Sequence, residues 1–325
     1  MTASVKLIAL VVLSFWIDTT LCQNNCFPKC NYGTVAVVFI TQKDTSTPSN
    51  VVKPGHISSC GYRNDNGLVA KNVETPHNVA QFGEFPWMVL ISHPNGTYIC
   101  GGSLIAPNVV LTTAHDVIDK IPEELSVRAG EWDRESDFEP YRHQNALVKE
   151  IICHEDFGRN TLNNDIALLI LENSFTLMPN VQPICLPEIN TKLDLINCVS
   201  SGWGQYKLRG IGADQQILEK VNLSVVPDSM CETQMRINCN AFYSKLNLHS
   251  SFICAGGVRG NEERMRGSGS PLICPDYNDP KRYYQVGIVA WGSGGSAQNV
   301  PGLYSNVMYL RNFIIKKLEE KGVNL

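Results

Sequence analysis

The sequence predicts an all-β protein that ends with an amphipathic helix. Short apolar, β-rich runs recur between glycines and prolines, a pattern typical of a β-barrel or a β-sandwich. The runs span 87–91, 103–113, 166–171, 221–226, 284–291 and 303–307. Near the end of the chain, apolar residues return at helical spacing with lysines and glutamates between them, at Leu310, Phe313, Ile314 and Leu318. This spacing predicts a helix over 309–321.

The first residues are typical of a secreted protein. Residues 1–22 carry Lys6 and then an apolar stretch that is too short for a membrane span, which takes ~20 residues. We therefore expect a signal peptide that is cleaved after Cys22. The sequence contains 12 cysteines, a number that favours disulfides and an oxidising, extracellular location. Removal of Cys22 leaves an odd number, which predicts a free thiol or an intermolecular bond.

Composition excludes several classes of function. The 325 residues carry a net charge of −4, so no basic excess points to nucleic acid as a partner. We expect no membrane association, because no segment after the signal peptide is a candidate span. Cys and His spacings do not match a zinc site, and His143 and His154 are interpreted as loop residues. No metal or other cofactor is expected. Asn95 and Asn222 each begin a glycosylation sequon.

The chain divides into a leader region and a folded domain. Residues 23–72 hold little core material, and the Thr, Ser, Pro and Asn content of 45–50 indicates a linker. Cys26 and Cys30 could close a small local loop in this region. We interpret 23–72 as a pro-segment or linker and predict that 73–325 forms the folded domain.

Three short segments carry the residues that nucleophilic catalysis needs. His115 ends Leu111-Thr112-Thr113-Ala114-His115, Asp165 lies before the apolar stretch 166–169, and Ser268 lies in Arg266-Gly267-Ser268-Gly269-Ser270-Pro271. An imidazole can take the proton of a serine hydroxyl, and a carboxylate can orient that imidazole. The three residues are therefore the candidate catalytic residues.

Nine segments in order resemble those of the chymotrypsin-like (S1) serine proteases, over about 60–325. They are Phe85-Pro86-Trp87, Cys100-Gly101-Gly102-Ser103-Leu104-Ile105, Thr113-Ala114-His115, Asp165-Ile166-Ala167-Leu168-Leu169, Pro183-Ile184-Cys185-Leu186-Pro187, Gly202-Trp203-Gly204, Ile253-Cys254-Ala255-Gly256, Ala290-Trp291-Gly292 and Pro301-Gly302-Leu303-Tyr304. The resemblance implies a peptidase S1 domain of two six-stranded antiparallel β-barrels with a C-terminal helix. It also implies that His115, Asp165 and Ser268 occupy the triad positions, in the family's chain order.

A narrower resemblance is to the arthropod clip-type serine protease homologs of the prophenoloxidase-activating-factor and masquerade-like kind. It rests on the segments 60–64, 83–89, 152–157 and 248–257. Members of that group act as non-catalytic cofactors in immune cascades. The resemblance implies protein partners, namely proteases or zymogens of an extracellular cascade. A clip domain normally has six cysteines, so a degenerate clip remnant is the alternative interpretation of 23–72.

The surroundings of Ser268 depart from the pattern of active members. Arg266 replaces a glycine whose N–H helps form the oxyanion hole, and losing one such donor costs roughly 2.7–4 kcal/mol. Gly267 replaces the aspartate that receives the N-terminal ammonium freed by activation. Counting back from Pro86, Asn72-Val73-Glu74-Thr75-Pro76 stands where active members have Ile-Val-Gly-Gly after a basic residue.

The specificity pocket is altered as well. Arg264 and Ser296 stand where the family has a disulfide that braces the pocket. Glu262 falls where trypsin-like enzymes carry an acidic pocket base, and there it could attract Arg or Lys side chains. The alternative interpretation, which we favour, is a solvated loop residue.

The cysteines follow the family pattern with one exception. Asp116 stands where the family has a cysteine, which leaves Cys100 without its usual partner. The pairs that the resemblance implies are Cys198 with Cys274, Cys231 with Cys254, and Cys60 with Cys185. Cys153 and Cys239 are left as an extra bridge.

Two main hypotheses follow for function. The first is a secreted serine protease homolog, catalytically impaired or inactive, that acts as a binding cofactor or regulator in an innate immune, melanisation-type cascade. It explains the joint loss of the activation, oxyanion and pocket features. The alternative is an active trypsin-like endopeptidase that uses His115, Asp165 and Ser268. A free-thiol role for Cys100 is a third, weaker hypothesis, because nothing electropositive lies beside it in the sequence.

Overall fold

The computed structural model describes residues 60–69, 76–136, 139–204, 215–238, 247–257, 267–291, 300–323 and 325. The chain separates into two units, 1–54 and 55–325, and the described residues belong to the second. The expected signal peptide and the segment with Cys26 and Cys30 therefore lie outside the described residues.

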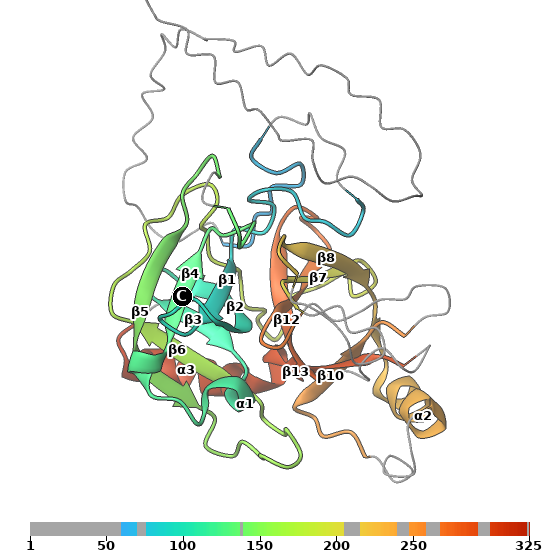
Figure 1. Cartoon of the computed structure of the whole chain (residues 1–325). Helices are drawn as coiled ribbons and strands as arrows, with labels where there is room; N and C mark the ends of the chain where they lie inside the picture. Colours follow the sequence, from blue (N-terminus) through green and yellow to red (C-terminus); the bar gives the residue numbers. More distant parts are fainter. Residues whose placement is uncertain are drawn as a thin grey trace, which may run out of the picture. The chain divides into compact units, whose positions relative to one another are not determined.

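The first sheet is a closed antiparallel barrel in the strand order β1-β2-β3-β6-β5-β4. Its strands are β1 (Met88–Ser92), β2 (Tyr98–Ala106), β3 (Val109–Thr112), β4 (Ser126–Ala129), β5 (Gln144–Cys153) and β6 (Ala167–Leu171). Two short helical elements lie between β3 and β4, α1 (Ala114–Val117) and η1 (Pro122–Glu124). Closure of the sheet gives the described part of this barrel no unpaired strand edge. Figure 1 shows the barrel in blue-green to green.

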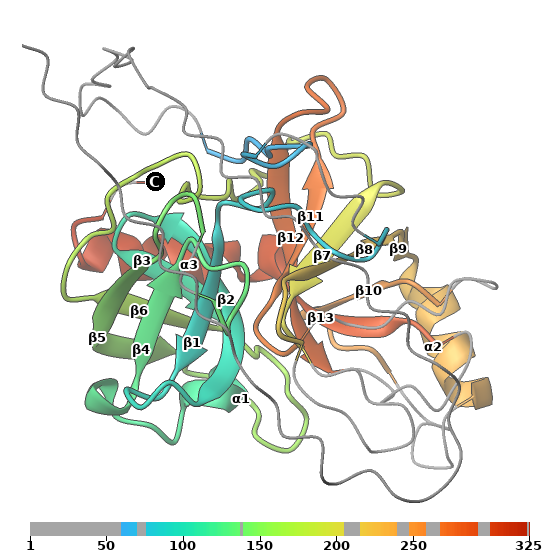
Figure 2. The same cartoon turned by 45° about the horizontal axis from the view of Figure 1, so that its top comes forward.

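The second sheet contains seven described strands in the order β8-β7-β11-β12-β13-β10-β9. They are β7 (Cys198–Gly202), β8 (Glu219–Leu223), β9 (Val225–Val226), β10 (Phe252–Ala255), β11 (Pro271–Pro275), β12 (Tyr283–Trp291) and β13 (Gly302–Asn306). This confirms the all-β chymotrypsin-type fold, but the second sheet differs from the expected six strands. The additional strand is β9, which pairs only its two residues with Cys254 and Ala255 of β10. Figure 2 shows the two sheets beside each other.

The expected run 103–113 is not one strand but parts of two. β2 and β3 form a hairpin that turns at Pro107 and Asn108, with Ala106 opposite Val109. Every residue of β3 is buried, and so are Cys100–Ala106 in β2. Because both strands are apolar up to the turn, hydrophobicity alone did not separate them.

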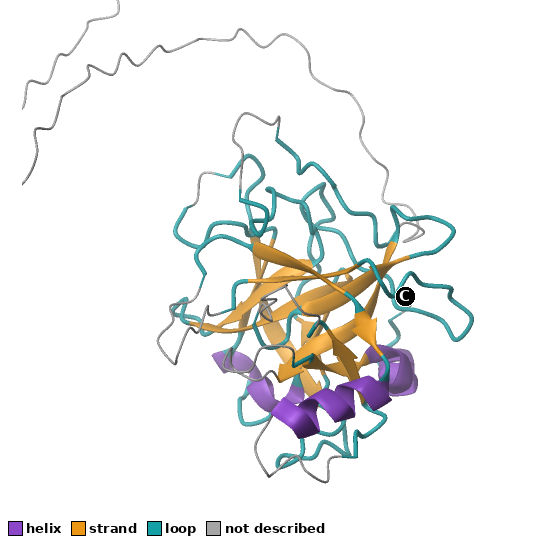
Figure 3. Ribbon diagram, turned by 90° about the vertical axis from the view of Figure 1, so that its right-hand side faces the viewer, coloured by secondary structure: helices purple, strands orange, loops and turns teal. Residues whose placement is uncertain are grey.

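The remaining helices are α2 (Asp228–Asn238) and the C-terminal α3 (Val307–Glu320). Asn306 caps α3, because its side-chain oxygen accepts a hydrogen bond from the N–H of Tyr309 at 3.2 Å. The apolar face predicted for this helix is confirmed: Val307, Leu310, Phe313, Ile314 and Leu318 are buried. Figure 3 shows the helices in purple below the strands. None of the described helices has the length and hydrophobicity that a membrane span needs.

A shared core joins the two sheets. Trp87 and Leu168 of the first barrel, Trp203 after β7, and Leu310 of α3 belong to one buried apolar cluster. All four side chains are nearly or fully inaccessible to solvent. Each buried aromatic side chain removes roughly 150–250 Å² of surface from solvent. Burial of this much apolar surface fixes the position of one sheet against the other.

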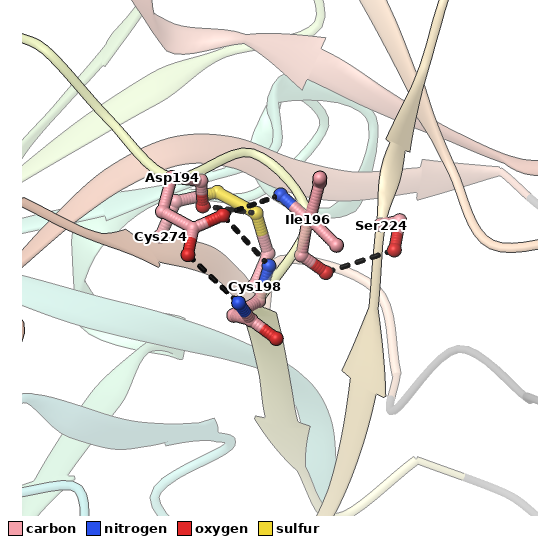
Figure 4. Close-up of a disulfide and its surroundings, with 6 residues drawn as sticks. Asp194, Ile196, Cys198, Ser224 and Cys274 are labelled. Atoms are coloured by element: carbon pink, nitrogen blue, oxygen red, sulfur yellow. Dashed lines mark hydrogen bonds between the residues drawn. A yellow bond between two sulfur atoms is a disulfide. The ribbon is translucent and has the colours of Figure 1, made fainter. Parts of the chain in front are cut away.

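Three disulfides form as the resemblance implies. They join Cys60 to Cys185, Cys198 to Cys274, and Cys231 to Cys254. Figure 4 shows the second of these, beside a turn in which Asp194 accepts a hydrogen bond from the N–H of Ile196 at 3.0 Å. The expected bridge from Cys153 is wrong: Cys153 carries a free thiol, and Cys239 lies outside the described residues.

Candidate catalytic site

Two of the three candidate residues lie beside strands of the first barrel, and the third precedes a strand of the second sheet. His115 follows β3 by three positions, and Asp165 precedes β6 by two. β3 and β6 pair with Thr112 opposite Ala167, so the chain brings His115 and Asp165 to the same end of the barrel. Ser268 precedes β11 in the second sheet, and its carbonyl accepts a hydrogen bond from the N–H of Gly101 in β2 at 2.8 Å. The site therefore lies where the two sheets meet.

The structure brings all three side chains into hydrogen-bonding contact. His115 Nδ1 lies 2.6 Å from Asp165 Oδ2, and His115 Nε2 lies 3.0 Å from Ser268 Oγ. The other oxygen of Asp165 accepts a hydrogen bond from the N–H of His115 at 2.9 Å. The Asp165 side chain is fully buried, so both of its oxygens need donors, and His115 supplies one to each. This is the connectivity of a serine–histidine–aspartate triad.

Glycine at 269 lets the Ser268 loop approach the first barrel closely. Gly269 has a φ of +77°, and a Cβ built there would lie 2.1 Å from the carbonyl oxygen of Gly101 and 2.5 Å from Thr112 Oγ1. Gly269 also donates its N–H to Val289 of β12 at 2.9 Å. Only glycine tolerates both the backbone conformation and the contact. The loop that presents Ser268 is therefore held against both sheets through its backbone.

Gly267, directly before Ser268, has no room for a side chain. Its φ is +96°, and a Cβ there would lie 2.8 Å from the Cα of Gly204, 3.0 Å from its nitrogen and 3.1 Å from the hydroxyl of Tyr98. A backbone contact of that kind cannot be relieved by a side-chain rotation. The described loop thus accommodates glycine at the position where the resemblance implies an aspartate in active members.

Asp116 is a site residue that sequence reasoning missed. Its Oδ2 accepts a hydrogen bond from Ser268 Oγ at 2.5 Å and another from Thr113 Oγ1 at 2.5 Å. The same oxygen lies 3.5 Å from His115 Nε2. The sequence indicates only that Asp116 stands where the family has a cysteine, and it assigns Asp116 no role in the site. The available signal was an acidic side chain next to the candidate base, in a short turn that keeps neighbouring side chains close.

The two carboxylates change the acid–base properties of His115. Burial alone would lower the pKa of the imidazole, but the hydrogen bond and charge of Asp165 and the charge of Asp116 outweigh burial and raise the pKa above its ordinary value. A higher pKa favours the imidazolium form. That form can donate from both ring nitrogens but cannot accept a proton.

Cys100 lies below the site as a buried thiol. It is 1% exposed, and its sulfur lies 3.6 Å from Thr112 Oγ1. Burial, followed by the charge of Asp116, raises the pKa of the thiol well above its ordinary value. A thiol of that kind is protonated and unreactive at neutral pH, so nothing in its surroundings favours a nucleophilic role.

One group among the described residues could hold a metal ion. The ligand atoms of Glu131, Glu139 and His143 lie within 4.8 Å of one another, in the loop between β4 and β5. Glu131 also accepts a hydrogen bond from Arg128 at 2.9 Å. Burial, opposed by Arg128 and reinforced by Glu139, raises the pKa of Glu131 to about 7. His143 lies in a loop, as expected, and its Nδ1 lies 3.6 Å from Glu131 Oε2 within this cluster.

Several expected features fall outside the described residues. These are Arg266 at the oxyanion position, Arg264 and Ser296 at the missing pocket disulfide, Glu262, and most of the segment 72–76. Their interpretations remain predictions from the sequence.

Comparison with known proteins agrees with the fold. A family model described as "Trypsin" matches residues 75–314. "Phenoloxidase-activating factor 2" of Galleria mellonella is 40% identical over 294 residues, which cover 86% of this chain and 96% of that protein. "Inactive CLIP domain-containing serine protease A28" of Anopheles gambiae is 31% identical over 313 residues, 93% of this chain and 80% of that protein.

A second Anopheles gambiae relative, "Inactive CLIP domain-containing serine protease A8", is 36% identical over 269 residues, 80% of this chain and 71% of that protein. The family model covers well over half of the chain, and the relatives extend the match over most of the remainder. With the fold and the three-residue arrangement described above, the chain belongs to the trypsin family of S1 serine proteases and their homologs.

Proposed function

We propose that this chain is a secreted serine protease homolog without peptidase activity, which binds other proteins as a cofactor or regulator of an extracellular, melanisation-type proteolytic cascade. The observation that carries the proposal is the conformation of Gly267. Its φ is +96°, and a Cβ at this position would lie only 2.8 Å from the Cα of Gly204, which leaves no space for a carboxylate beside Ser268.

Active members of the family have an aspartate at the position of Gly267, and its carboxylate is needed for activation. There, an aspartate before the serine pairs with the ammonium freed by activation cleavage, and the pair orders the oxyanion loop. The oxyanion hole is usually the largest single contribution to catalysis, and each donor is worth roughly 2.7–4 kcal/mol. A chain without this aspartate cannot form the ion pair with the N-terminal ammonium, so cleavage cannot order its oxyanion loop in this way.

The relatives support both parts of the proposal. Three of them are named as inactive CLIP domain-containing serine proteases. The relative that is 40% identical is named as a phenoloxidase-activating factor, which supports a cascade role with protein partners. The three disulfides fit an extracellular protein.

An active trypsin-like endopeptidase is the second candidate. The observation that favours it is the triad geometry, with 2.6 Å from His115 to Asp165 and 3.0 Å from His115 to Ser268. A nucleophile and base at such distances are the usual signature of covalent catalysis. The contact of Asp116 argues against an active endopeptidase. Asp116 accepts the hydrogen bond from Ser268 that His115 would have to accept as the general base.

The test separates binding from catalysis with one substitution. Purified secreted protein and its Ser268→Ala variant are each added to prophenoloxidase with its activating protease, and phenoloxidase activity is measured. We expect both to increase phenoloxidase activity equally, and neither to react with a fluorophosphonate probe before or after limited trypsin cleavage. Labelling that needs Ser268, or a cofactor effect that Ser268→Ala abolishes, would overturn the proposal in favour of the endopeptidase.

A further inference from the structure

The hydroxyl group of Ser268 has a single proton to donate, and two groups compete for it. Asp116 Oδ2 lies 2.5 Å from Ser268 Oγ, and His115 Nε2 lies 3.0 Å from it. An ionised carboxylate has no proton of its own and can only accept. The shorter contact therefore requires Ser268 to donate to Asp116.

Thr113 holds the carboxylate in place for this contact. The Thr113 side chain is buried, and its hydroxyl donates to the same oxygen of Asp116 at 2.5 Å. Charge-assisted hydrogen bonds are roughly twice as strong as neutral ones. Two hydroxyl donors on one oxygen fix the rotamer of Asp116 beneath Ser268.

The protons on His115 then follow from its two neighbours. Nδ1 faces the carboxylate of Asp165, which accepts only, so Nδ1 carries a proton. Ser268 has given its proton to the hydrogen bond with Asp116, so it offers Nε2 a lone pair, and Nε2 must also carry a proton. Both ring nitrogens are protonated, and His115 is an imidazolium. The raised pKa of His115 agrees with this account.

We propose that Asp116 is an inactivating residue, which holds Ser268 as a hydrogen-bond donor and His115 as an imidazolium, so that the three triad residues meet without a general base. Asp116 acts through His115 and Ser268 and is thus a positioning residue. This inference deepens the proposed function, on which it rests, by giving a second cause of inactivity that is independent of Gly267.

Two carboxylates stabilise the imidazolium form of His115. Burial lowers the pKa of His115, but the hydrogen bond and charge of Asp165 and the charge of Asp116 outweigh burial and raise it. The titratable or charged groups that face His115 from the described elements are Asp116 and Asp165.

The test compares Asp116→Asn with the intact secreted chain. Asparagine keeps the shape of aspartate but removes the charge, so His115 loses one of the two carboxylates that stabilise its imidazolium. Nuclear magnetic resonance of the imidazole protons measures the pKa of His115 in both proteins. We expect a lower pKa in Asp116→Asn, and also in Asp116→Ser, which guards against misfolding of a single variant.

Asp119→Asn is the matched control. It removes a carboxylate three positions further along, where Asp119 is exposed and paired with Arg159 at 2.7 Å, and it should leave the pKa of His115 unchanged. An unchanged pKa of His115 in folded Asp116→Asn and Asp116→Ser would overturn the inference, whatever the reactivity of the serine.

Fluorophosphonate labelling distinguishes this failure from failure of the proposed function. Labelling of the intact chain at Ser268 would overturn the proposed function, while the pKa comparison would still decide the role of Asp116. We expect no labelling of the intact chain. Labelling of Asp116→Asn on the order of 10²-fold above that background, and its loss in the Asp116→Asn, Ser268→Ala double variant, would support the inference because a general base contributes that much.

Discussion

Lys220 donates hydrogen bonds to both carboxylate oxygens of Glu84, at 2.8 Å each, and the Glu84 side chain is fully buried. Arg63 pairs with the same carboxylate, and its guanidinium lies 4.9 Å from the centre of the Phe85 ring. Glu84 thus joins three parts of the chain: the segment near Cys60, the residues before β1, and strand β8. A buried anion with two cations is stable only while all partners remain.

The first prediction concerns this buried cluster. Glu84→Ala removes the anion and leaves Arg63 and Lys220 in a largely buried position without their shared carboxylate. Loss of one partner from a buried ion pair costs about 3–5 kcal/mol, so we expect a loss of that size in the free energy of unfolding measured with urea. Glu123→Ala, at an exposed position, should change it by less than about 0.5 kcal/mol. A loss below about 1 kcal/mol for Glu84→Ala would contradict a structural role for the cluster.

The second prediction concerns the backbone that holds Ser268. Gly269→Ala places a methyl group 2.1 Å from the carbonyl oxygen of Gly101 and also carries the cost of a positive φ. Gly96→Ala is a matched control, since Gly96 has a φ of +88° and nothing within 4 Å of a Cβ. We expect about 1–2 kcal/mol of destabilisation for Gly96→Ala, the cost of the left-handed conformation alone. Gly269→Ala should lose at least about 2 kcal/mol more in urea unfolding. Equal losses would mean that the loop moves away from the barrel at no cost.

The meeting of His115, Asp165 and Ser268 could be predicted from the sequence, whereas the role of Asp116 could not. Family segments identify which strand each triad residue follows or precedes, and the fold then determines their distances. Asp116 contacts a residue 152 positions later, and no family segment describes that contact because the family has a cysteine there. Only the atomic positions show that its carboxylate reaches the hydroxyl of Ser268.

Two strand boundaries were predicted wrongly from the sequence, and both errors have the same physical cause. The hairpin of β2 and β3 looked like a single run because both strands are buried and the turn at Pro107 and Asn108 occupies only two residues. Strand β9 was not separated from β8 because one residue, Ser224, lies between them. Pairing partners distinguish such short strands, and hydrophobicity does not.

The third prediction is a pH dependence of stability that arises from Glu131. Its pKa rises from an ordinary value of 4.5 to about 7, with Glu139, Arg128 and His143 as its titratable or charged neighbours. A carboxyl group with a raised pKa binds its proton more tightly in the folded chain. Its contribution to stability is therefore fully present below pH 4.5 and is lost as the pH rises through about 7.

Glu131→Gln should flatten this dependence. Urea unfolding at pH 5 and pH 8, in the presence of EDTA so that no divalent cation contributes, measures the change in each protein. We expect a smaller loss of stability between the two pH values in Glu131→Gln than in the unsubstituted chain. The same loss in both proteins would assign the dependence to other groups, such as His115.

The fourth prediction concerns glycosylation. Asn95 is exposed in the turn between β1 and β2, and its side-chain oxygen accepts a hydrogen bond from the N–H of Thr97 at 3.0 Å. Asn222 is exposed on β8, at the edge of the described second sheet. We expect protein secreted from eukaryotic cells to lose the mass of its glycans on treatment with an N-glycosidase. The Asn95→Gln variant should lose less mass, by the amount of one glycan. Secreted protein whose mass does not change would exclude glycans at both positions.

The disulfide between Cys60 and Cys185 spans 125 positions of the chain and determines what a proteolytic cut can do. The only arginine or lysine residues between Cys60 and Phe85 are Arg63, which is paired with Glu84, and Lys71. A trypsin-like cut after Lys71 would convert one polypeptide into two that remain a single covalent molecule. Its hydrodynamic size would stay the same, and only reduction would separate the fragments. Cleavage would then give this protein a new pair of chain ends without releasing any part of it.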